Sequence, residues 1–237
     1  MFRGSLLQAV NFLLHRHLAA RDLGSIAGTG AMLPDLWRMA DRRVRPAPGP
    51  VASTSGAELT ALLAGIDHHL RADRWFHAAP IFLEGERLTS DRLRASGLDA
   101  PKLGLFAHIA WELCLDGALL RREGLAPILV ALRAGFEVIG RAARDAVSLH
   151  HFDRVPRTTA ERAVFEAGMR RLFTEIARGP WVEGYQCGAG VAQRIEGMRL
   201  RLGLGRFDAV ERARLGDVFE TLSPDADDAI TDLLRRI

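Results

Sequence analysis

The apolar run Leu103–Leu120, LGLFAHIAWELCLDGALL, is the feature that most restricts what this chain can fold into. Its only ionisable side chains are His108, Glu112 and Asp116, which follow one another at intervals of four residues. A segment that is apolar on all its other sides is typical of a helix buried all round. Because an isolated carboxylate in such a helix must bind a cation or take up a proton at a high cost in free energy, the run predicts a polar stripe that faces a partner.

A second segment carries a stripe with the same spacing. Within residues 65–80, GIDHHLRADRWFHAAP, the apolar seam of a helix meets His69 and Asp73, and His77 follows four residues later. Neighbouring Cβ atoms along such a stripe lie about 5–6 Å apart, a spacing that suits a shared ion. Two helices that face each other with these stripes would enclose one or two divalent metals with imidazole and carboxylate ligands.

Taken one at a time, these residues have a simpler interpretation. A single histidine on an apolar helix face is usually a core histidine with satisfied hydrogen bonds. Asp116, which precedes Gly117, is compatible with a carboxylate that faces a loop. Buried clusters of ionisable groups are uncommon without a function, so the repetition of the pattern on two helices favours a metal site.

The rest of the sequence predicts an all-α protein, a multi-helix bundle in a single domain over residues 1–237. Hydrophobic residues make up 48% of the chain, which is enough to bury a substantial core. Arg45–Gly56 is rich in proline, glycine and serine and is expected to be a surface loop. Glu84–Pro101 predicts a short helix between loops that would act as a lid, and helices within residues 206–237 are expected to complete the bundle.

Helical periods predict further helices over residues 5–21, 125–147, 158–177, 191–201, 208–219 and 224–237. Thr158 and Glu161 form the signature of a capping box, and the apolar members of the helix that follows include Val164, Met169 and Phe173. Glycines 24, 28 and 30 are expected to loosen the backbone ahead of Pro34, which suits the first turn of a helix. The glycine-rich stretch Gly179–Gly190 is expected to be a loop.

Charge and cysteine content bear on partners and compartment. The formal net charge is +3 and no dense basic stripe with interleaved aromatics is present, so nucleic-acid polymers are not expected as partners. Cys114 and Cys187 suggest neither a disulfide framework nor a zinc-binding CxxC motif, which fits a reducing cytoplasm. The N-terminal apolar run lacks a small-residue cleavage site and is interpreted as mature protein. Leu103–Leu120 approaches the length of a membrane span, but its three ionisable groups favour a buried helix of a soluble protein.

Three other residues are candidate metal ligands. His17 lies on the apolar seam of the first helix and His15 lies toward its flank. Asp35 follows Pro34 and is equally compatible with a metal ligand and with an acidic residue stabilised by the dipole at a helix start.

Basic side chains supply candidates for holding a phosphate. Arg71, Arg74 and Arg201 can make paired, charge-assisted hydrogen bonds to phosphate oxygens, and solvated helix faces are the alternative. The sequence HHFD at residues 150–153 lies where the helical period lapses, so we interpret it as a solvated loop.

Four stretches of the chain, in order, resemble motifs of the acyl-carrier-protein phosphodiesterase family. Asn11–Ala19, NFLLHRHLA, resembles the family's NFLxHxHLA, and Gly30–Asp35 resembles its G-x4-D segment. Ala64–Asp73, AGIDHHLRAD, resembles its AGIxxHRxxD, and Trp181–Arg201 resembles its W…Y…GMxxR segment. Together these matches span most of the chain.

The resemblance implies an all-helical, HD-domain-like fold and a metal-dependent hydrolase, typically with manganese. Family members remove 4′-phosphopantetheine from holo-acyl carrier protein by cleaving a serine phosphodiester. Carried over by position, the metal-site residues are His15, His17, Asp35, His69 and Asp73. The sequence departs from the family in the buried helix, where Asp-x3-Asp-His is replaced by His108-x3-Glu112-Leu113. It also has Asp67 where the family has histidine, and His77 where the family has an acidic residue.

Together these patterns predict a metal-dependent phosphodiesterase in which His77 and Asp73 are the catalytic candidates and His77 transfers the proton. The expected partner is acyl carrier protein or another phosphodiester substrate. A first alternative is a zinc- or iron-dependent phosphoesterase acting on a phospholipid or nucleotide, because histidine-enriched ligand sets favour those metals. A second alternative is a metal-free helical binding protein whose site has decayed.

Overall fold

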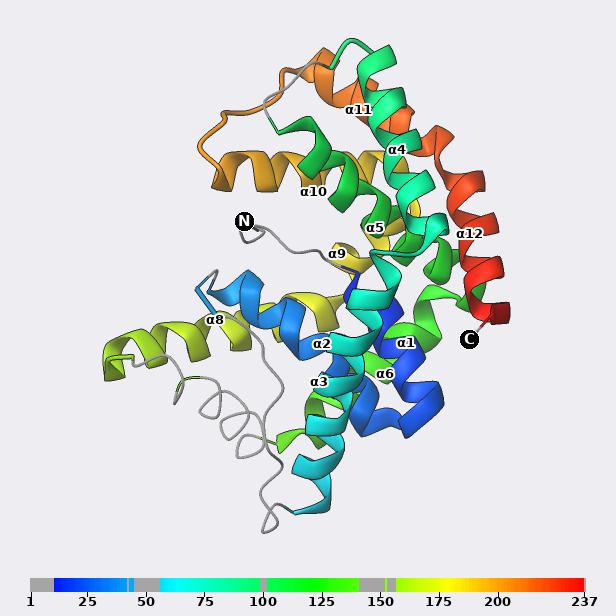
Figure 1. Ribbon diagram of the computed structural model, residues 1–237. Coiled ribbons are helices and arrows are strands. Elements are labelled where there is room, and N and C mark those ends of the chain that lie inside the picture. Colours follow the sequence, from blue (N-terminus) through cyan, green and yellow to red (C-terminus); the bar gives the residue numbers. More distant parts are fainter. Residues whose placement is uncertain are drawn as a thin grey trace. The chain divides into compact units, whose positions relative to one another are not determined.

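The computed structural model describes residues 11–41, 43–44, 56–98, 102–140, 152 and 157–236. Within these residues the regular structure is helical throughout, with no strand, as Figure 1 shows. The prediction of an all-α protein is therefore confirmed. The surface loop expected over residues 45–56 and the solvated loop expected over residues 150–153 lie almost entirely outside the described residues.

The chain divides into two compact units, each built from more than one stretch of the sequence. Among the described residues, unit 1 comprises Phe12–Trp75 and Ala126–Gly179, and unit 2 comprises Asn11, Phe76–Leu125 and the residues from Pro180 onward. Each unit is described separately below.

Unit 1 contains α1 (Phe12–Leu23), α2 (Ser25–Ala40), nearly all of α3 (Ala57–Phe76), most of α6 (Leu125–Val138), and α8 (Thr159–Arg178). The expected loosened backbone ahead of a helix start at Pro34 is wrong, because α2 continues through Gly28, Gly30 and Pro34. A proline inside a helix costs about 3 kcal/mol or more. Burial of the surrounding side chains offsets that cost, since twelve residues of α2 from Ala27 to Arg38 are all buried.

Glycines bring α2 and α3 together. A Cβ atom added to Gly30 would lie 2.2 Å from the carbonyl oxygen of Leu62, and one added to Gly65 would lie 1.9 Å from that of Ala27. Only a residue without a side chain permits backbones to approach so closely. The glycines of α2 therefore serve helix packing, whereas the sequence pattern had suggested a loosened backbone.

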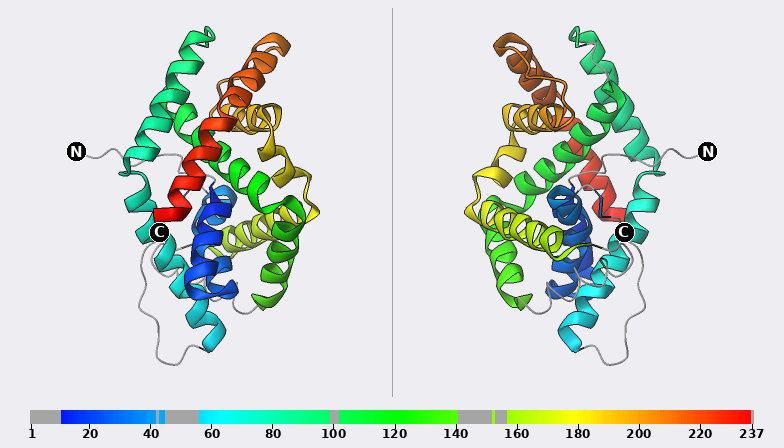
Figure 2. Two further views of the ribbon diagram at one scale, coloured as in Figure 1. Left: turned by 90° about the vertical axis from the view of Figure 1, so that its right-hand side faces the viewer. Right: turned by 90° about the vertical axis from the view of Figure 1, so that its left-hand side faces the viewer.

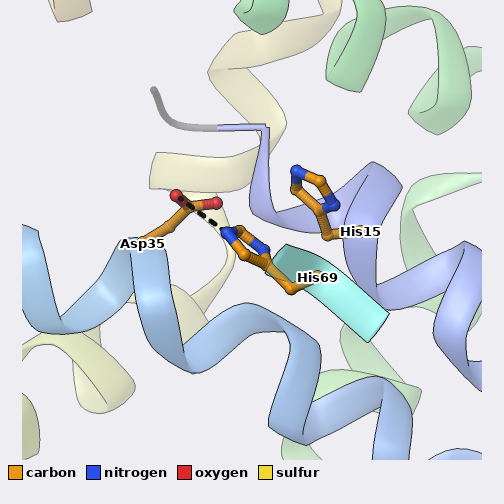
Figure 3. Close-up of side chains that lie close together, drawn as sticks. All are labelled: His15, Asp35 and His69. Atoms are coloured by element: carbon orange, nitrogen blue, oxygen red, sulfur yellow. Dashed lines mark ion pairs between the residues drawn. The ribbon is translucent and has the colours of Figure 1, made fainter. Parts of the chain in front are cut away.

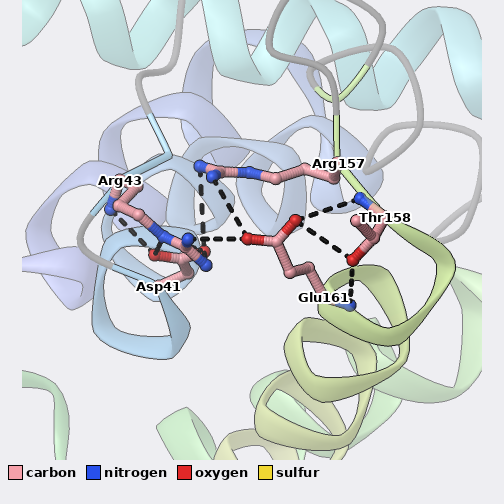
Figure 4. A network of polar contacts seen from close by, with 5 residues as sticks. All are labelled: Asp41, Arg43, Arg157, Thr158 and Glu161. Atoms are coloured by element: carbon pink, nitrogen blue, oxygen red, sulfur yellow. Dashed lines mark hydrogen bonds and ion pairs between the residues drawn. The ribbon is translucent and has the colours of Figure 1, made fainter.

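The start of α8 confirms the predicted capping box. The Thr158 side chain accepts a hydrogen bond from the Glu161 backbone N–H at 3.2 Å, and the Glu161 carboxylate accepts one from the Thr158 backbone at 3.0 Å. Arg43, just after α2, donates to Asp41 and to Glu161, so the network of Figure 4 joins the end of α2 to the start of α8. Of the three apolar residues named for α8, Met169 and Phe173 are buried, whereas Val164 is 72% exposed and takes no part in the core.

Unit 2 contains α4 (Pro80–Ala95), α5 (Leu103–Glu123), α9 (Pro180–Glu183), the 3₁₀ helix η1 (Gly184–Gln186), α10 (Gly188–Arg201), α11 (Ala209–Thr221) and α12 (Ser223–Arg236). The helix α5 packs against α4, α12, η1 and α10. The green ribbon of α5 can be followed beside the red ribbon of α12 in both views of Figure 2.

The buried apolar helix predicted from Leu103 onward is confirmed as α5. Among the described helices it alone is long and apolar enough to cross a membrane, and 78% of its most apolar window is buried inside the protein. The helix expected within residues 84–101 is present as α4, but it begins at Pro80, runs for 16 residues and packs on α5. The loop expected at 179–190 is wrong, because this stretch contains α9, η1 and the first turn of α10.

Candidate metal centres

Three side chains from three helices converge inside unit 1. His15 lies on α1, Asp35 on α2 and His69 on α3, and Figure 3 shows them pointing toward one another. All three are buried, and their potential ligand atoms lie within 4.8 Å of one another. This unit 1 cluster combines two imidazoles with one carboxylate, a donor set that suits a divalent transition metal.

The contacts within the unit 1 cluster are close but not those of ordinary hydrogen bonds. The Nε2 atom of His69 lies 4.0 Å from Oδ1 of Asp35, and the rings of His15 and His69 have centroids 4.0 Å apart. At these separations a carboxylate and two imidazoles surround a common point. Asp73, whose side chain is 17% exposed, adds a second carboxylate at the edge, with Oδ1 3.9 Å from Nε2 of His15.

Helix packing explains why these residues meet. Gly65 lies one turn before His69 on α3 and contacts the backbone of α2, so it holds this part of α3 against α2. Asp35 lies in the middle of α2 and is buried, so the alternative that it is an N-terminal helix charge is wrong. The close crossing of the two helices brings the imidazole of His69 to the carboxylate of Asp35.

A second cluster forms inside unit 2 from residues on α5 and the residue that follows α3. The Nε2 atom of His77 lies 2.9 Å from Oε1 of Glu112, and Nε2 of His108 lies 3.5 Å from the same oxygen. The Glu112 side chain is fully buried, and the two histidine side chains are about one fifth exposed. The potential ligand atoms of this unit 2 cluster also lie within 4.8 Å of one another.

Two residues of α4 surround the unit 2 cluster. The ring of Phe82 lies against both imidazoles, with centroid separations of 4.7 Å to His77 and 5.0 Å to His108. Glu86 places Oε2 3.3 Å from Nδ1 of His108. Burial by itself lowers the pKa of His108, but the hydrogen bond and charge of Glu112 and the charge of Glu86 outweigh it and raise that pKa to about 9. The two carboxylates thus stabilise positive charge at His108.

Several predicted site residues lie outside both clusters. His17 is half-buried on α1, and Asp116 is fully buried on α5 one turn after Glu112. Neither of them, nor Asp73, belongs to a group of three or more potential ligands among the described residues.

The three predicted phosphate-binding arginines are exposed. Arg71 makes an ion pair with Asp67 on its own helix, and Arg74 donates to the Leu70 carbonyl oxygen on the same helix. These contacts are typical of a solvated helix face. Arg201 lies at the end of α10.

The sequence analysis missed three residues near these sites. Glu86 and Phe82 lie on α4, which was expected to be a lid, and no pattern connected them with His108. Arg38 lies three residues after Asp35 on α2 and is buried, a rare environment for a guanidinium. Once Asp35 is assigned to the interior of a helix, the sequence alone places Arg38 one turn away from it.

The chain was compared with family models, with curated proteins and with solved structures, and no match was found in any of the three comparisons. The resemblance to acyl-carrier-protein phosphodiesterases therefore stays a prediction from four sequence motifs.

Proposed function

We propose that this protein is a metal-dependent phosphodiesterase whose metal centre is the unit 1 cluster. The observation that carries the proposal is the convergence of His15, Asp35 and His69 from three separate helices at one buried point. The same three residues stand at positions that the family resemblance marks as metal-site residues. Packing alone gives no reason to gather two imidazoles and a carboxylate there, because buried ionisable groups cost free energy.

The donor set fits a divalent cation. His15 and His69 each offer a ring nitrogen and Asp35 offers a carboxylate oxygen, so the protein would supply three ligands and leave further positions for solvent or substrate. A bound divalent cation would polarise a phosphoryl oxygen and lower the pKa of a water molecule. The family resemblance suggests Mn²⁺, which accepts nitrogen and oxygen ligands together.

Other residues of unit 1 have roles in the same proposal. Asp73 lies at the more exposed edge of the cluster beside His15, a position suited to accepting a proton from an attacking water. Arg38 offers a buried guanidinium one turn from Asp35, which suits the orientation of a phosphate by charge-assisted hydrogen bonds. Burial of the cluster strengthens these electrostatic interactions, because water is largely excluded.

The proposed substrate is holo-acyl carrier protein, with release of 4′-phosphopantetheine, and the proposed fold relationship is to HD-domain phosphohydrolases. Both follow from the four sequence motifs. A cytoplasmic location belongs to the same proposal, since Cys114 and Cys187 suggest no disulfide framework, which fits a reducing compartment.

The test is to incubate the purified protein with holo-acyl carrier protein and Mn²⁺ and to follow the mass of the carrier. We expect the mass to fall to that of the apo carrier. His69→Ala should abolish this change, because it removes a metal ligand. His68→Ala is the matched control: His68 is the neighbouring residue on α3, and its ring lies 3.1 Å from Asp22 outside the cluster.

Two results would contradict the proposal at different levels. If the carrier mass is unchanged after incubation with metal-loaded protein, holo-acyl carrier protein is not the substrate. Equal Mn²⁺ binding by wild type and His69→Ala would remove the unit 1 cluster as the metal centre.

A zinc- or iron-dependent phosphoesterase with another substrate is the second candidate function. The observation that favours it is the presence of two imidazoles in each cluster, since imidazole suits zinc and iron. Hydrolysis of small aromatic phosphodiesters, a phospholipid and a cyclic nucleotide should be measured with Zn²⁺, Fe²⁺ and Mn²⁺ in parallel. Turnover of one of these with zinc or iron, and none of the carrier, would select this function.

A further inference from the structure

We propose that the unit 2 cluster is a second, separate divalent-metal site of the zinc type, held by His77, His108 and Glu112 and open to one solvent ligand. It shares no residue with the centre of the proposed phosphodiesterase. The inference therefore stands or falls independently of that function.

The spacing of the ligand atoms is close to what one zinc ion requires. Bonds of about 2.0–2.1 Å at tetrahedral angles place two ligand atoms about 3.3 Å apart. In the structure, Oε1 of Glu112 lies 2.9 Å from Nε2 of His77 and 3.5 Å from Nε2 of His108. Side-chain shifts of a few tenths of an ångström would let all three residues bind one ion.

The carboxylate of Glu112 supplies an independent observation. Its Oε2 atom is buried and has no hydrogen-bond partner among the described residues. An unsatisfied, fully buried carboxylate oxygen carries a desolvation penalty, and the penalty is larger when the group is charged. A cation that binds the carboxylate compensates this penalty. The contacts of the two imidazoles with Oε1 do not, because they leave Oε2 without a hydrogen bond.

The surroundings of His108 are those of a metal ligand. Its Nε2 atom faces Glu112, while its Nδ1 atom lies 3.3 Å from the carboxylate of Glu86. Histidines that bind metals commonly donate the other ring N–H to a carboxylate, which fixes the tautomer and orientation of the ring. Phe82 further restricts both imidazoles, because its ring lies against each of them.

The exposure of the site indicates an open coordination position. Glu112 is fully buried, but the side chains of His77 and His108 are 21% and 22% exposed, so solvent reaches the imidazole side. Three protein ligands with a solvent molecule in the fourth position is the arrangement of catalytic zinc sites, whereas structural sites are closed by four protein ligands. The unit 2 site is therefore of the catalytic type.

The test is a titration of metal-free full-length protein with Zn²⁺, followed by calorimetry and by metal analysis after gel filtration. Two variants remove a carboxylate at the site: Glu112→Gln deletes a ligand, and Glu86→Gln weakens the outer partner of His108. Glu84→Gln is the matched control, because it makes the same chemical change on α4 at an exposed residue two positions away. Circular dichroism of the metal-free variants checks that each one is folded.

We expect Glu112→Gln to lose one equivalent of zinc and Glu86→Gln to bind that equivalent about 10–100-fold more weakly. Glu84→Gln should match the wild type. Replacement of zinc by Co²⁺ should give visible absorption bands, and Glu112→Gln should lose the part of this absorption that corresponds to one bound Co²⁺ ion. Zinc binding that is equal in all four proteins would overturn the proposal and identify the cluster as a carboxylate–imidazole hydrogen-bond network.

The two proposals fail in distinguishable ways. Loss of one zinc equivalent in Glu112→Gln but not in His69→Ala would support the unit 2 site and oppose the unit 1 centre. The reverse pattern would overturn the unit 2 site and leave the proposed phosphodiesterase centre intact.

Discussion

Replacing Gly65 by alanine should destabilise the protein and disturb the unit 1 cluster. The added Cβ would lie 1.9 Å from the carbonyl oxygen of Ala27 and 2.7 Å from its carbonyl carbon. Cβ contacts under 3.0 Å are essentially never seen, so α2 and α3 must separate locally by about 1.1 Å. The clashing atoms belong to the backbone, so no flexible side chain can move aside.

The expected magnitude follows from two opposing terms. Alanine has a higher helix propensity than glycine by about 1 kcal/mol, which favours the variant. Overpacking costs about 1–3 kcal/mol or more, and a clash with backbone belongs at the upper end or beyond. We expect a net loss of about 2 kcal/mol, which for a chain of this size lowers Tm by about 4–8 °C.

Gly197→Ala is the matched control. Gly197 lies inside α10, and a Cβ added there would meet no atom within 4 Å. The same substitution should therefore raise Tm by about 2–4 °C, because only the propensity term remains.

Thermal unfolding followed by circular dichroism measures both variants, and a Mn²⁺ titration of Gly65→Ala reports on the cluster. Because Gly65 is one turn from His69, metal binding should weaken even at temperatures where the variant is folded. A Gly65→Ala protein that melts at or above the wild-type temperature would refute the close helix crossing as the element that positions His69.

Three further outcomes are expected. At pH 8 a chromogenic disulfide reagent should label only Cys187 in the folded protein and both cysteines after denaturation. The reason is that burial raises the pKa of Cys114 to about 12 and also keeps the reagent away from its thiol. Burial alone would raise the pKa of Asp41, but hydrogen bonds within the network of Figure 4 outweigh burial and lower that pKa. The ionised Asp41 side chain therefore stabilises the fold above its ordinary pKa, and this contribution is lost as pH falls below about 4. In urea titrations across that range, the unfolding free energy of Asp41→Asn should therefore fall less steeply on acidification than that of the wild type, and parallel curves would contradict this. Thr158→Ala should lower the unfolding free energy by about 1 kcal/mol through loss of the capping box. Thr174→Ala is the control, because it removes only a hydrogen bond to a carbonyl oxygen of its own helix, and it should leave the unfolding free energy unchanged or slightly higher.

Much of the helical structure was predictable because its signals are local. The apolar run of α5 and the capping box of α8 lie within a few turns of sequence, and both are present in the structure. The prediction failed at α2, where the glycines were interpreted as loosening the backbone and Pro34 as belonging to the first turn of a helix. The role of Gly30 depends on the backbone of α3 at Leu62, more than thirty residues away in the sequence, and no local pattern reports such a contact.

The candidate sites show the same division. The sequence identified His69, Asp73 and His77 as one stripe that suits a shared ion, but residues eight positions apart on a helix are separated by about 12 Å along its axis. One ion with bonds of about 2 Å cannot span that length. In the structure His69 meets residues of α1 and α2, while His77 meets residues of α5.

The amino-acid sequence by itself determined that this chain is helical and that imidazoles and carboxylates lie on faces that a core would bury. Periodicity and capping determine those properties, and both act over a few residues. Only the tertiary structure decided which of these groups meet, because a ligand set is completed by side chains from different helices. Their approach depends on close packing, such as that of Gly65 against Ala27, between segments that are distant in the sequence.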